Sequence, residues 1–254
     1  MNSDDLRRYL EFYQDLGIKT LYRRPALVPE PPAAPVLEQP APVPVKAEQT
    51  MDAPPLILPS LEPANDSLLK IIEDIGDCKR CRLHQGRNKI VFGVGNEKSP
   101  LVFVGEGPGA DEDAQGIPFV GRAGQLLTQM IEGTAKREGM DLQRADIYIC
   151  NVVKCRPPEN RNPEPDEMEI CGQFLYRQLA VIKPKAICAL GGIAARAVTG
   201  RKDGVTRMRG HWFQWRDIPV MVTYHPSFLL RGYNAAAKRE AWEDLKKVLH
   251  FVYD

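Results

Sequence analysis

Residues 105–124 read GEGPGADEDAQGIPFVGRAG and connect a strand pattern to a helix pattern. The apolar tetrapeptide at 101–104 is short and bounded by proline and glycine, which predicts a buried strand. Residues 125–137 place apolar side chains at helical spacing. Open α/β sheets bind their ligands where a strand crosses into a helix, so we expect the functional site in this loop.

The glycines of this loop let the main chain approach a ligand closely, most directly at Gly105 and Gly107. Phe119 is an aromatic residue with little local packing available to it. The spacing G-x-G-x-x-A formally fits a dinucleotide-binding turn, but Pro108 removes a hydrogen-bond donor and the carboxylates at 111–113 would repel a pyrophosphate. We therefore exclude that site and interpret the carboxylates as a solvated first helical turn.

The rest of the folded region alternates between strand and helix patterns. Further strands are expected at 147–153, 186–190 and 220–223, and further helices at 68–75, 165–179, 192–198 and 236–252. Such alternation predicts an α/β fold, a three-layer α/β/α domain with a central, largely parallel sheet.

The first 65 residues differ in composition from the remainder. Residues 1–24 show the spacing of a short amphipathic helix, and residues 25–65 hold 12 of the 22 prolines, which predicts a disordered linker. A helix on such a tether suggests a docking peptide for a protein partner, although a fortuitous extension fits equally well. Residues 66–254 are expected to form the catalytic domain, which carries a net charge of +4.

Composition narrows the class of protein. The chain has 254 residues, 43% of them hydrophobic, and a net charge of +1. No apolar run approaches the roughly 18 residues of a membrane span, and the N-terminus is too charged for a signal peptide. We expect a cytoplasmic monomer with no membrane contact.

Four of the six cysteines form a candidate metal site. Cys78 and Cys81 make a C-x-x-C pair, and Cys155 and Cys171 lie among charged or proline-rich residues. Four thiolates suit either a tetrahedral zinc ion or a [4Fe–4S] cluster, and the single close pair leans slightly toward the cluster. The other two cysteines lie inside apolar strands and are expected only to pack.

Several motifs together resemble the family 4 uracil-DNA glycosylases, the iron–sulfur branch of that superfamily. They are the glycine-rich loop, NVVKCRPPENRNP at 151–163, HPSFLLR at 225–231 and the four cysteines. The resemblance covers residues 66–254. It implies a monofunctional hydrolase of DNA repair that flips uracil out of DNA, cleaves its N-glycosidic bond and leaves an abasic site. It also implies a structural [4Fe–4S] cluster on the four cysteines.

The resemblance assigns roles in the uracil pocket. Phe119 would stack on the flipped base, and the Asn151 amide would pair with its edge and reject cytosine. His225 would bind O2 of uracil and stabilise the charge that develops there. Main-chain N–H groups of the Gly105–Gly107 segment would help to form this pocket.

Two assignments from the resemblance are less direct. An aspartate of the best-known glycosylases is replaced here by Gly107, so Glu106 and Glu112 are the candidates for orienting the attacking water. Within 225–231, Ser227 and Arg231 would contact DNA, and Leu229 is the candidate wedge that fills the gap left by the base.

Three alternatives remain at this stage. A related glycosylase type stays covalently trapped on its product, but its compact arginine-rich insertion is missing between residues 199 and 212. A non-catalytic iron–sulfur DNA-binding module would lack Asn151 or His225, and both are present. The stretch 196–216, basic and rich in aromatic residues, fits a phosphate-contacting surface or a solvated β-hairpin equally well.

Overall fold

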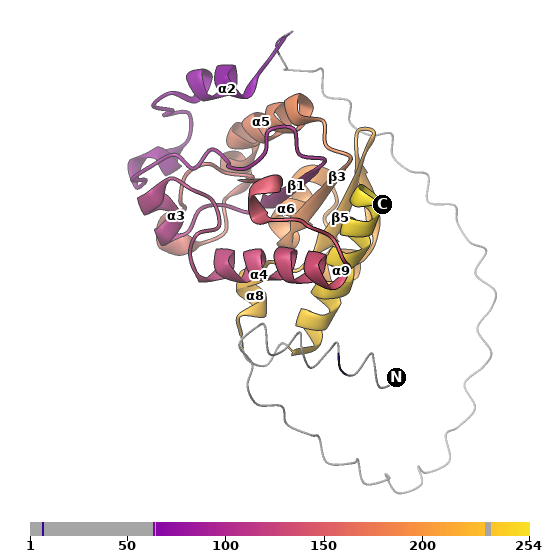
Figure 1. The fold of residues 1–254 in the computed structure, drawn as a ribbon. Helices are drawn as coiled ribbons and strands as arrows, with labels where there is room; N and C mark the ends of the chain where they lie inside the picture. Colours follow the sequence, from indigo (N-terminus) through magenta and orange to yellow (C-terminus); the bar gives the residue numbers. More distant parts are fainter. Residues whose placement is uncertain (1–6, 8–62, 64, 232–234) are drawn as a thin grey trace, which may run out of the picture.

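The structure is a computed structural model that describes residues 7, 63, 65–231 and 235–254 (Figure 1). The N-terminal helix predicted at 1–24 and the linker predicted at 25–65 lie almost entirely outside the described residues. Both therefore stay predictions.

Helices and strands alternate along the described chain as the patterns predict, and each predicted element is present within a few residues of its expected bounds. In chain order the elements are α2 (Leu68–Ile75), the 3-10 helix η1 (Arg82–Gln85), β1 (Leu101–Gly105), α3 (Ala110–Gln115), α4 (Arg122–Arg137), η2 (Arg144–Asp146), β2 (Tyr148–Asn151), η3 (Pro158–Asn160), α5 (Pro165–Ile182), β3 (Ala186–Leu190), α6 (Gly191–Thr199), α7 (Val205–Met208), β4 (Trp212–Trp215), β5 (Ile218–Thr223), α8 (Pro226–Leu229) and α9 (Ala235–Tyr253).

Several short elements were not predicted, among them α3, α7, α8 and the 3-10 helices. The acidic segment after Gly109 forms the short helix α3, which ends at Gly116 with φ of 82°. Its carboxylates do lie in a first helical turn, as expected, but Asp113 is fully buried and accepts hydrogen bonds from both nitrogens of Asn88. The acidic triplet is therefore only partly a solvated surface.

The five strands form one sheet in the order β2-β1-β3-β5-β4. Strands β2, β1, β3 and β5 are parallel, and only the edge strand β4 runs antiparallel, to β5. The predicted three-layer fold with a largely parallel sheet is confirmed. Only the end of the stretch 196–216 joins a hairpin, in which β4 pairs with β5, while the earlier part contains the end of α6 and α7.

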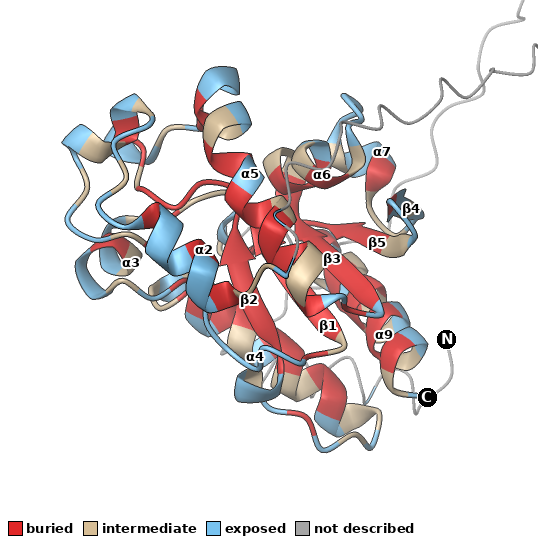
Figure 2. Cartoon of the chain, turned by 90° about the horizontal axis from the view of Figure 1, so that it is seen from above, coloured by how far each residue is buried: buried red, intermediate tan, exposed pale blue. Residues whose placement is uncertain are grey.

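Two apolar cores lie on opposite faces of the sheet, because the central strands are buried on both sides (Figure 2). Helices α2, α5 and α6 cover one face, and α4, α8 and α9 cover the other (Figure 1). Side chains that alternate along β1 serve the two cores in turn, with Val102 and Val104 on one face and Leu101 and Phe103 on the other.

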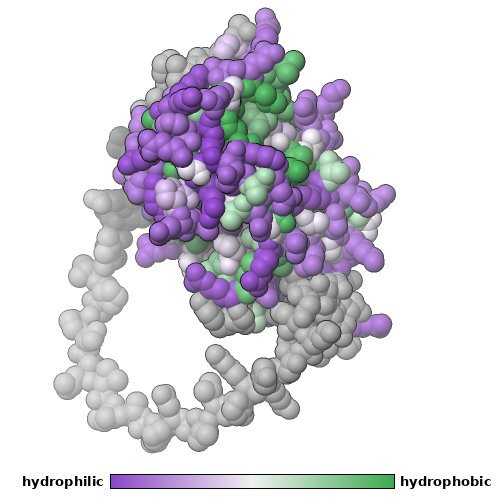
Figure 3. All heavy atoms as spheres, turned by 90° about the vertical axis from the view of Figure 1, so that its left-hand side faces the viewer, coloured by the Kyte–Doolittle hydropathy of each residue, from purple (hydrophilic) through white to green (hydrophobic). Residues whose placement is uncertain are grey.

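The surface is mostly polar on the face that Figure 3 shows. Hydrophilic residues cover most of the face shown in Figure 3, and the apolar residues there are scattered in small groups. None of the described helices combines the length and the apolar character that crossing a membrane requires.

The strand order creates a crevice at one end of the sheet. Strand β1 lies between β2 and β3. The chain passes from β1 to β2 on one side and later crosses to β3 on the other side, so the connecting loops diverge at the carboxyl end of β1. Parallel sheets bind ligands at such a switch point. The loop of residues 105–124 begins at this end, as predicted.

Candidate active site

A cavity of about 680 Å³ opens at the carboxyl ends of the four parallel strands. Its volume lies within the range of small-molecule sites. The residues that follow β1, β2, β3 and β5 all contribute to it. Most of the predicted site residues line its wall, namely Glu106, Gly107, Glu112, Phe119, Asn151, His225, Ser227 and Arg231.

Asn151 is the last residue of β2 and pairs in register with Gly105 at the end of β1. A side chain on Gly105 would collide with Asn151 Oδ1 and with the ring of Phe119. Glycine at 105 therefore makes the room in which these two side chains meet. This explains in steric terms why the loop begins with a glycine.

The amide oxygen of Asn151 is a buried acceptor without a partner. The residue is 1% exposed, and no hydrogen-bond donor of the described residues reaches Oδ1. An unpaired buried polar atom is costly, and such atoms in native proteins cluster where a ligand completes the pairing. The cavity thus presents a fixed acceptor to whatever enters it.

Phe119 is held in an unusual main-chain conformation, with φ of 54°. Its neighbour Pro118 accepts a hydrogen bond of 2.7 Å from the Arg144 guanidinium, and a side chain on Gly124 would collide with the Phe119 main chain. The ring is 6% exposed and lies 5.7 Å from that of His225, between centroids. Arg144 is a supporting residue that the sequence reasoning missed, because it lies 25 positions further along the chain.

Both carboxylate oxygens of Glu112 accept hydrogen bonds from main-chain N–H groups. Oε1 accepts from the N–H groups of Val120 and Gly121 at 2.9 Å, and Oε2 accepts from Gly109 at 3.1 Å. The carboxylate thus ties together the two ends of the loop that carries Phe119. Its observed role is to hold the loop in place.

Glu106 is the carboxylate that remains available in the cavity. It is half-buried, and no hydrogen bond to its carboxylate is found among residues 65–231 and 235–254. Burial raises the pKa of Glu106 above its usual value because the charged form loses hydration. Of the two predicted acidic candidates, this one faces the ligand space without a competing partner.

His225 follows β5 and caps α8. Its Nδ1 accepts from the Ser227 main-chain N–H at 3.2 Å and lies 2.8 Å from Ser227 Oγ. Burial lowers the pKa of His225 to about 4, so the imidazole is neutral near pH 7. Since Nδ1 is an acceptor, we assign the proton to Nε2, which can donate to a ligand.

Comparison with known proteins decides the family. Residues 92–246 match the family model described as the uracil DNA glycosylase superfamily. The chain belongs to this superfamily. It is 44% identical over 190 residues to a type-4 uracil-DNA glycosylase of Thermotoga maritima, covering 74% of this chain and 96% of that protein. It is 42% identical over 191 residues to the type-4 uracil-DNA glycosylase of Archaeoglobus fulgidus, covering 72% and 92%.

These likenesses confirm the predicted family, with type-4 proteins among its matches, and the predicted class of enzyme, a hydrolytic glycosylase. A third type-4 uracil-DNA glycosylase, from Sulfurisphaera tokodaii, is 43% identical over 191 residues, covering 72% of this chain and 84% of that protein. Residues 92–246, which the family model matches, contain the whole sheet and the residues that line the cavity.

The turn after β5 buries the side chain that was predicted to be the wedge of this glycosylase. Leu229 is fully buried in the core between α4 and α9 and does not line the cavity. It would have to leave that core to enter DNA. Ser227 and Arg231 do line the cavity and are exposed.

Cationic side chains border the cavity of the glycosylase beyond those predicted. Arg161, from the loop after η3, and Arg196, on α6, line the cavity together with Arg231. Arg161 is oriented by the buried carboxylate of Glu167, at 2.7 Å and 2.9 Å. Arg161 lies in the quoted motif 151–163, and Arg196 begins the basic stretch 196–216, so weak signals for both were present.

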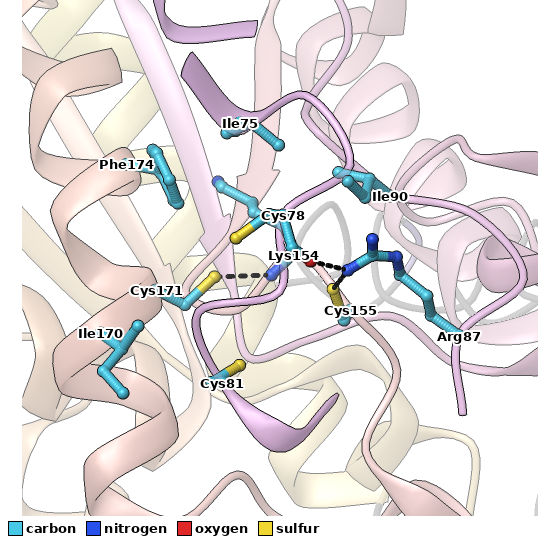
Figure 4. A pocket seen from close by; sticks show the side chains of 10 residues that line it. All are labelled: Ile75, Cys78, Cys81, Arg87, Ile90, Lys154, Cys155, Ile170, Cys171 and Phe174. Atoms are coloured by element: carbon cyan, nitrogen blue, oxygen red, sulfur yellow. Dashed lines mark hydrogen bonds between the residues drawn. The ribbon is translucent and has the colours of Figure 1, made fainter. Parts of the chain in front are cut away.

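The four predicted cysteines of the glycosylase line one pocket between the sheet, α5 and the segment before η1 (Figure 4). Arg87 donates to Cys155 Sγ at 3.4 Å, and the Lys154 main chain donates to Cys171 Sγ at 3.2 Å. The Lys154 ammonium is buried and donates to the Asn151 carbonyl oxygen and to Gln178. The sequence reasoning missed both cations.

The geometry of the thiol groups bears on what the pocket can hold. No three His, Cys, Asp or Glu side chains of the described residues are grouped as a single metal ion would require. The other two cysteines, Cys150 and Cys188, are fully buried within β2 and β3 and do not line this pocket. Burial raises the pKa of Cys171 to about 12, and the neighbouring Lys154 offsets only part of this rise.

Proposed function

We propose that this chain excises uracil from DNA by hydrolysing its N-glycosidic bond, with the flipped base held in the cavity at the carboxyl end of the sheet. The family supports this reaction. The observation that carries it is the buried, unpaired Oδ1 of Asn151 beside Phe119 and His225. A uracil needs these three contacts: an acceptor for N3–H, an aromatic face and a donor to O2.

Recognition rests on the Asn151 amide. Oδ1 accepts the N3–H of uracil, and Nδ2 donates to O4. Cytosine offers an acceptor at position 3 and a donor at position 4, so both contacts become mismatched. A pocket that leaves buried groups unpaired rejects the wrong base by orders of magnitude. Stacking on Phe119 adds affinity for any flipped base, about 1–3 kcal/mol.

Bond cleavage leaves negative charge on uracil and positive charge on the sugar. The neutral His225 donates from Nε2 to O2 of the uracil as that charge develops. The donor is pre-oriented, because Ser227 fixes Nδ1 from the other side of the ring. A neutral imidazole avoids the cost of burying a cation before the reaction begins.

We assign to Glu106 the role of orienting the attacking water. Its carboxylate lies in the cavity without a hydrogen bond from the described residues, whereas both oxygens of Glu112 are engaged by main-chain N–H groups. A carboxylate of raised pKa can accept a proton from water or stabilise the cationic sugar. Glu112 instead positions the Phe119 loop.

The activity is tested with a labelled oligonucleotide that contains one uracil. Incubation with the purified protein followed by alkali is expected to break the strand at that position, while thymine and cytosine controls stay intact. Denaturing electrophoresis measures the breaks and would also reveal DNA-linked protein. Intact uracil strands would contradict the proposal, and a covalent adduct would indicate the product-trapped type.

The cofactor proposal concerns the pocket of four cysteines. The donor set is all sulfur, the Arg87 guanidinium donates to Cys155 Sγ, and the Lys154 main-chain N–H donates to Cys171 Sγ, which suits a negatively charged iron–sulfur centre. Four thiolates would also suit a tetrahedral zinc ion, which is the alternative to the proposed [4Fe–4S] cluster.

When bound, such a cluster supplies a structural brace. Glycosidic hydrolysis transfers no electrons, so the reaction does not need the cluster's redox chemistry. Cys78 and Cys81 lie before η1, Cys155 follows β2, and Cys171 is in α5, so the brace joins three separate segments. The main chain of Cys155 continues into the loop that carries Arg161 to the cavity wall. The brace therefore supports that wall indirectly.

Replacing Cys171 with serine is expected to remove the visible absorbance and the bound iron and sulfide, and to lower the melting temperature by about 10 °C. Cys188→Ala is the control, because this thiol is also buried but lies outside the pocket. A colourless wild-type protein that contains zinc would contradict the cluster. Residues 1–24 remain the predicted docking peptide for a protein partner.

A further inference from the structure

Strand β2, which ends in Asn151, lies at an edge of the sheet. Its inner side pairs with β1, so the main-chain groups on its outer side need other partners. Val94 serves Ile149 in this way, donating to it at 2.9 Å and accepting from it at 2.8 Å. Successive residues of a strand direct their main-chain groups to opposite sides. The carbonyl oxygen of Asn151, two residues after Ile149, therefore lies on the same outer side.

The partner of this carbonyl oxygen is a buried lysine side chain. Lys154 Nζ donates to the Asn151 oxygen at 2.8 Å and to Gln178 Oε1 at 2.6 Å. Lys154 is 2% exposed, so water does not compete for these hydrogen bonds. Hydrogen bonds from an ammonium group are stronger than those between neutral groups. The last residue of β2 is thus held at its carbonyl group by a side chain three positions further on.

Lys154 and Gln178 are themselves fixed by the surrounding structure. The Lys154 main-chain N–H donates to Cys171 Sγ at 3.2 Å, and Lys154 lines the pocket of four cysteines (Figure 4). Gln178 Nε2 donates to the Phe92 carbonyl oxygen and to the Tyr148 hydroxyl, both at 3.1 Å. The lysine therefore links the end of β2 to α5 and to the cysteine pocket.

The Asn151 amide depends on such a link for its direction. Its Oδ1 has no donor among the described residues, so no hydrogen bond to this oxygen orients the side chain before a base arrives. Where the amide points is then set by the position of the Asn151 main chain and by packing. A misplacement of about 1 Å in a site of this kind can cost 10²-fold in rate.

We propose that Lys154 is a positioning residue for base recognition: by holding the Asn151 carbonyl group, it directs the Asn151 amide toward the edge of the flipped uracil. Lys154 does not line the cavity, so it acts on the base through Asn151. Its main-chain contact with Cys171 makes the position of the amide depend on the packing of the cysteine pocket. This inference rests on the proposed excision of uracil.

A double-mutant cycle tests the proposal, with uracil excision measured under single-turnover conditions. Lys154→Met keeps a side chain of similar length without the donor and is expected to slow excision by about 10- to 100-fold. In the Asn151→Ala background, the same change should slow excision by less than about twofold, because no amide remains to be positioned. In the His225→Ala background it should keep its full effect, because His225 follows β5, which β1 and β3 separate from β2.

Gln178→Met is the second variant, because it releases Lys154 Nζ from one acceptor and leaves the lysine in place. Its loss of rate should be smaller and should also vanish without the Asn151 amide. Melting temperature and bound metal content show whether each variant keeps its fold and its cysteine pocket. Where Lys154→Met loses either, the cycle with Gln178→Met decides.

Two results would overturn the positioning role while the excision activity stands. One is an unchanged rate for Lys154→Met, and the other is an equal loss with and without the Asn151 amide, which would indicate a general structural role. A wild-type protein inert on uracil-containing DNA would overturn both the proposed function and this inference.

Discussion

Asn151→Asp is expected to lower uracil excision by at least about 10²-fold and to raise the excision of cytosine relative to uracil. Aspartate lacks the amide N–H group that donates to O4 of uracil, and an ionised carboxylate repels that oxygen. A protonated aspartate could instead donate to N3 of cytosine. The buried position, 1% exposed, removes water as a substitute partner.

Parallel assays on uracil- and cytosine-containing strands measure this change in selectivity. Asn160→Asp is the matched control, because it puts the same charge in the same cavity at an exposed side chain that accepts from Arg156. The control should keep its preference for uracil. An Asn151→Asp protein that is folded and retains full preference for uracil would contradict the recognition role.

His225→Ala is expected to reduce the rate of uracil excision by about 10²–10³-fold, the loss typical of removing one donor from an oxyanion site. The loss should appear in kcat more than in KM, because the donor meets its full charge only in the transition state. Single-turnover and steady-state assays separate the two. A variant with an unchanged kcat would show that the histidine does not stabilise the leaving base.

The same histidine makes the stability of the fold depend on pH in a defined direction. Burial lowers its pKa to about 4 from the ordinary value of 6.5, so the unfolded chain binds more protons between these values. The stability that the neutral histidine contributes is present above pH 6.5 and is lost as the pH falls toward about 4. Melting temperatures of His225→Ala should therefore decline less steeply than those of the wild type over this window.

The sequence by itself determined the layered fold. Strand patterns are short, local and apolar, so the buried strands at 101–104 and 186–190 could be located from their own residues. The four candidate metal-binding cysteines could also be predicted from the sequence, because few residue types bind metals. The motifs carried the family, and they placed Asn151 and His225 at strand ends, where the cavity lies.

Only the tertiary structure decided which of several similar side chains is available for function. Glu106 and Glu112 are equivalent in sequence terms, but Glu112 is taken up by main-chain groups eight and nine residues away. Leu229 and Phe228 are adjacent apolar residues, yet α4 and α9 bury one and leave the other exposed. Burial and hydrogen bonding depend on segments distant in the chain, so no local pattern could reveal them.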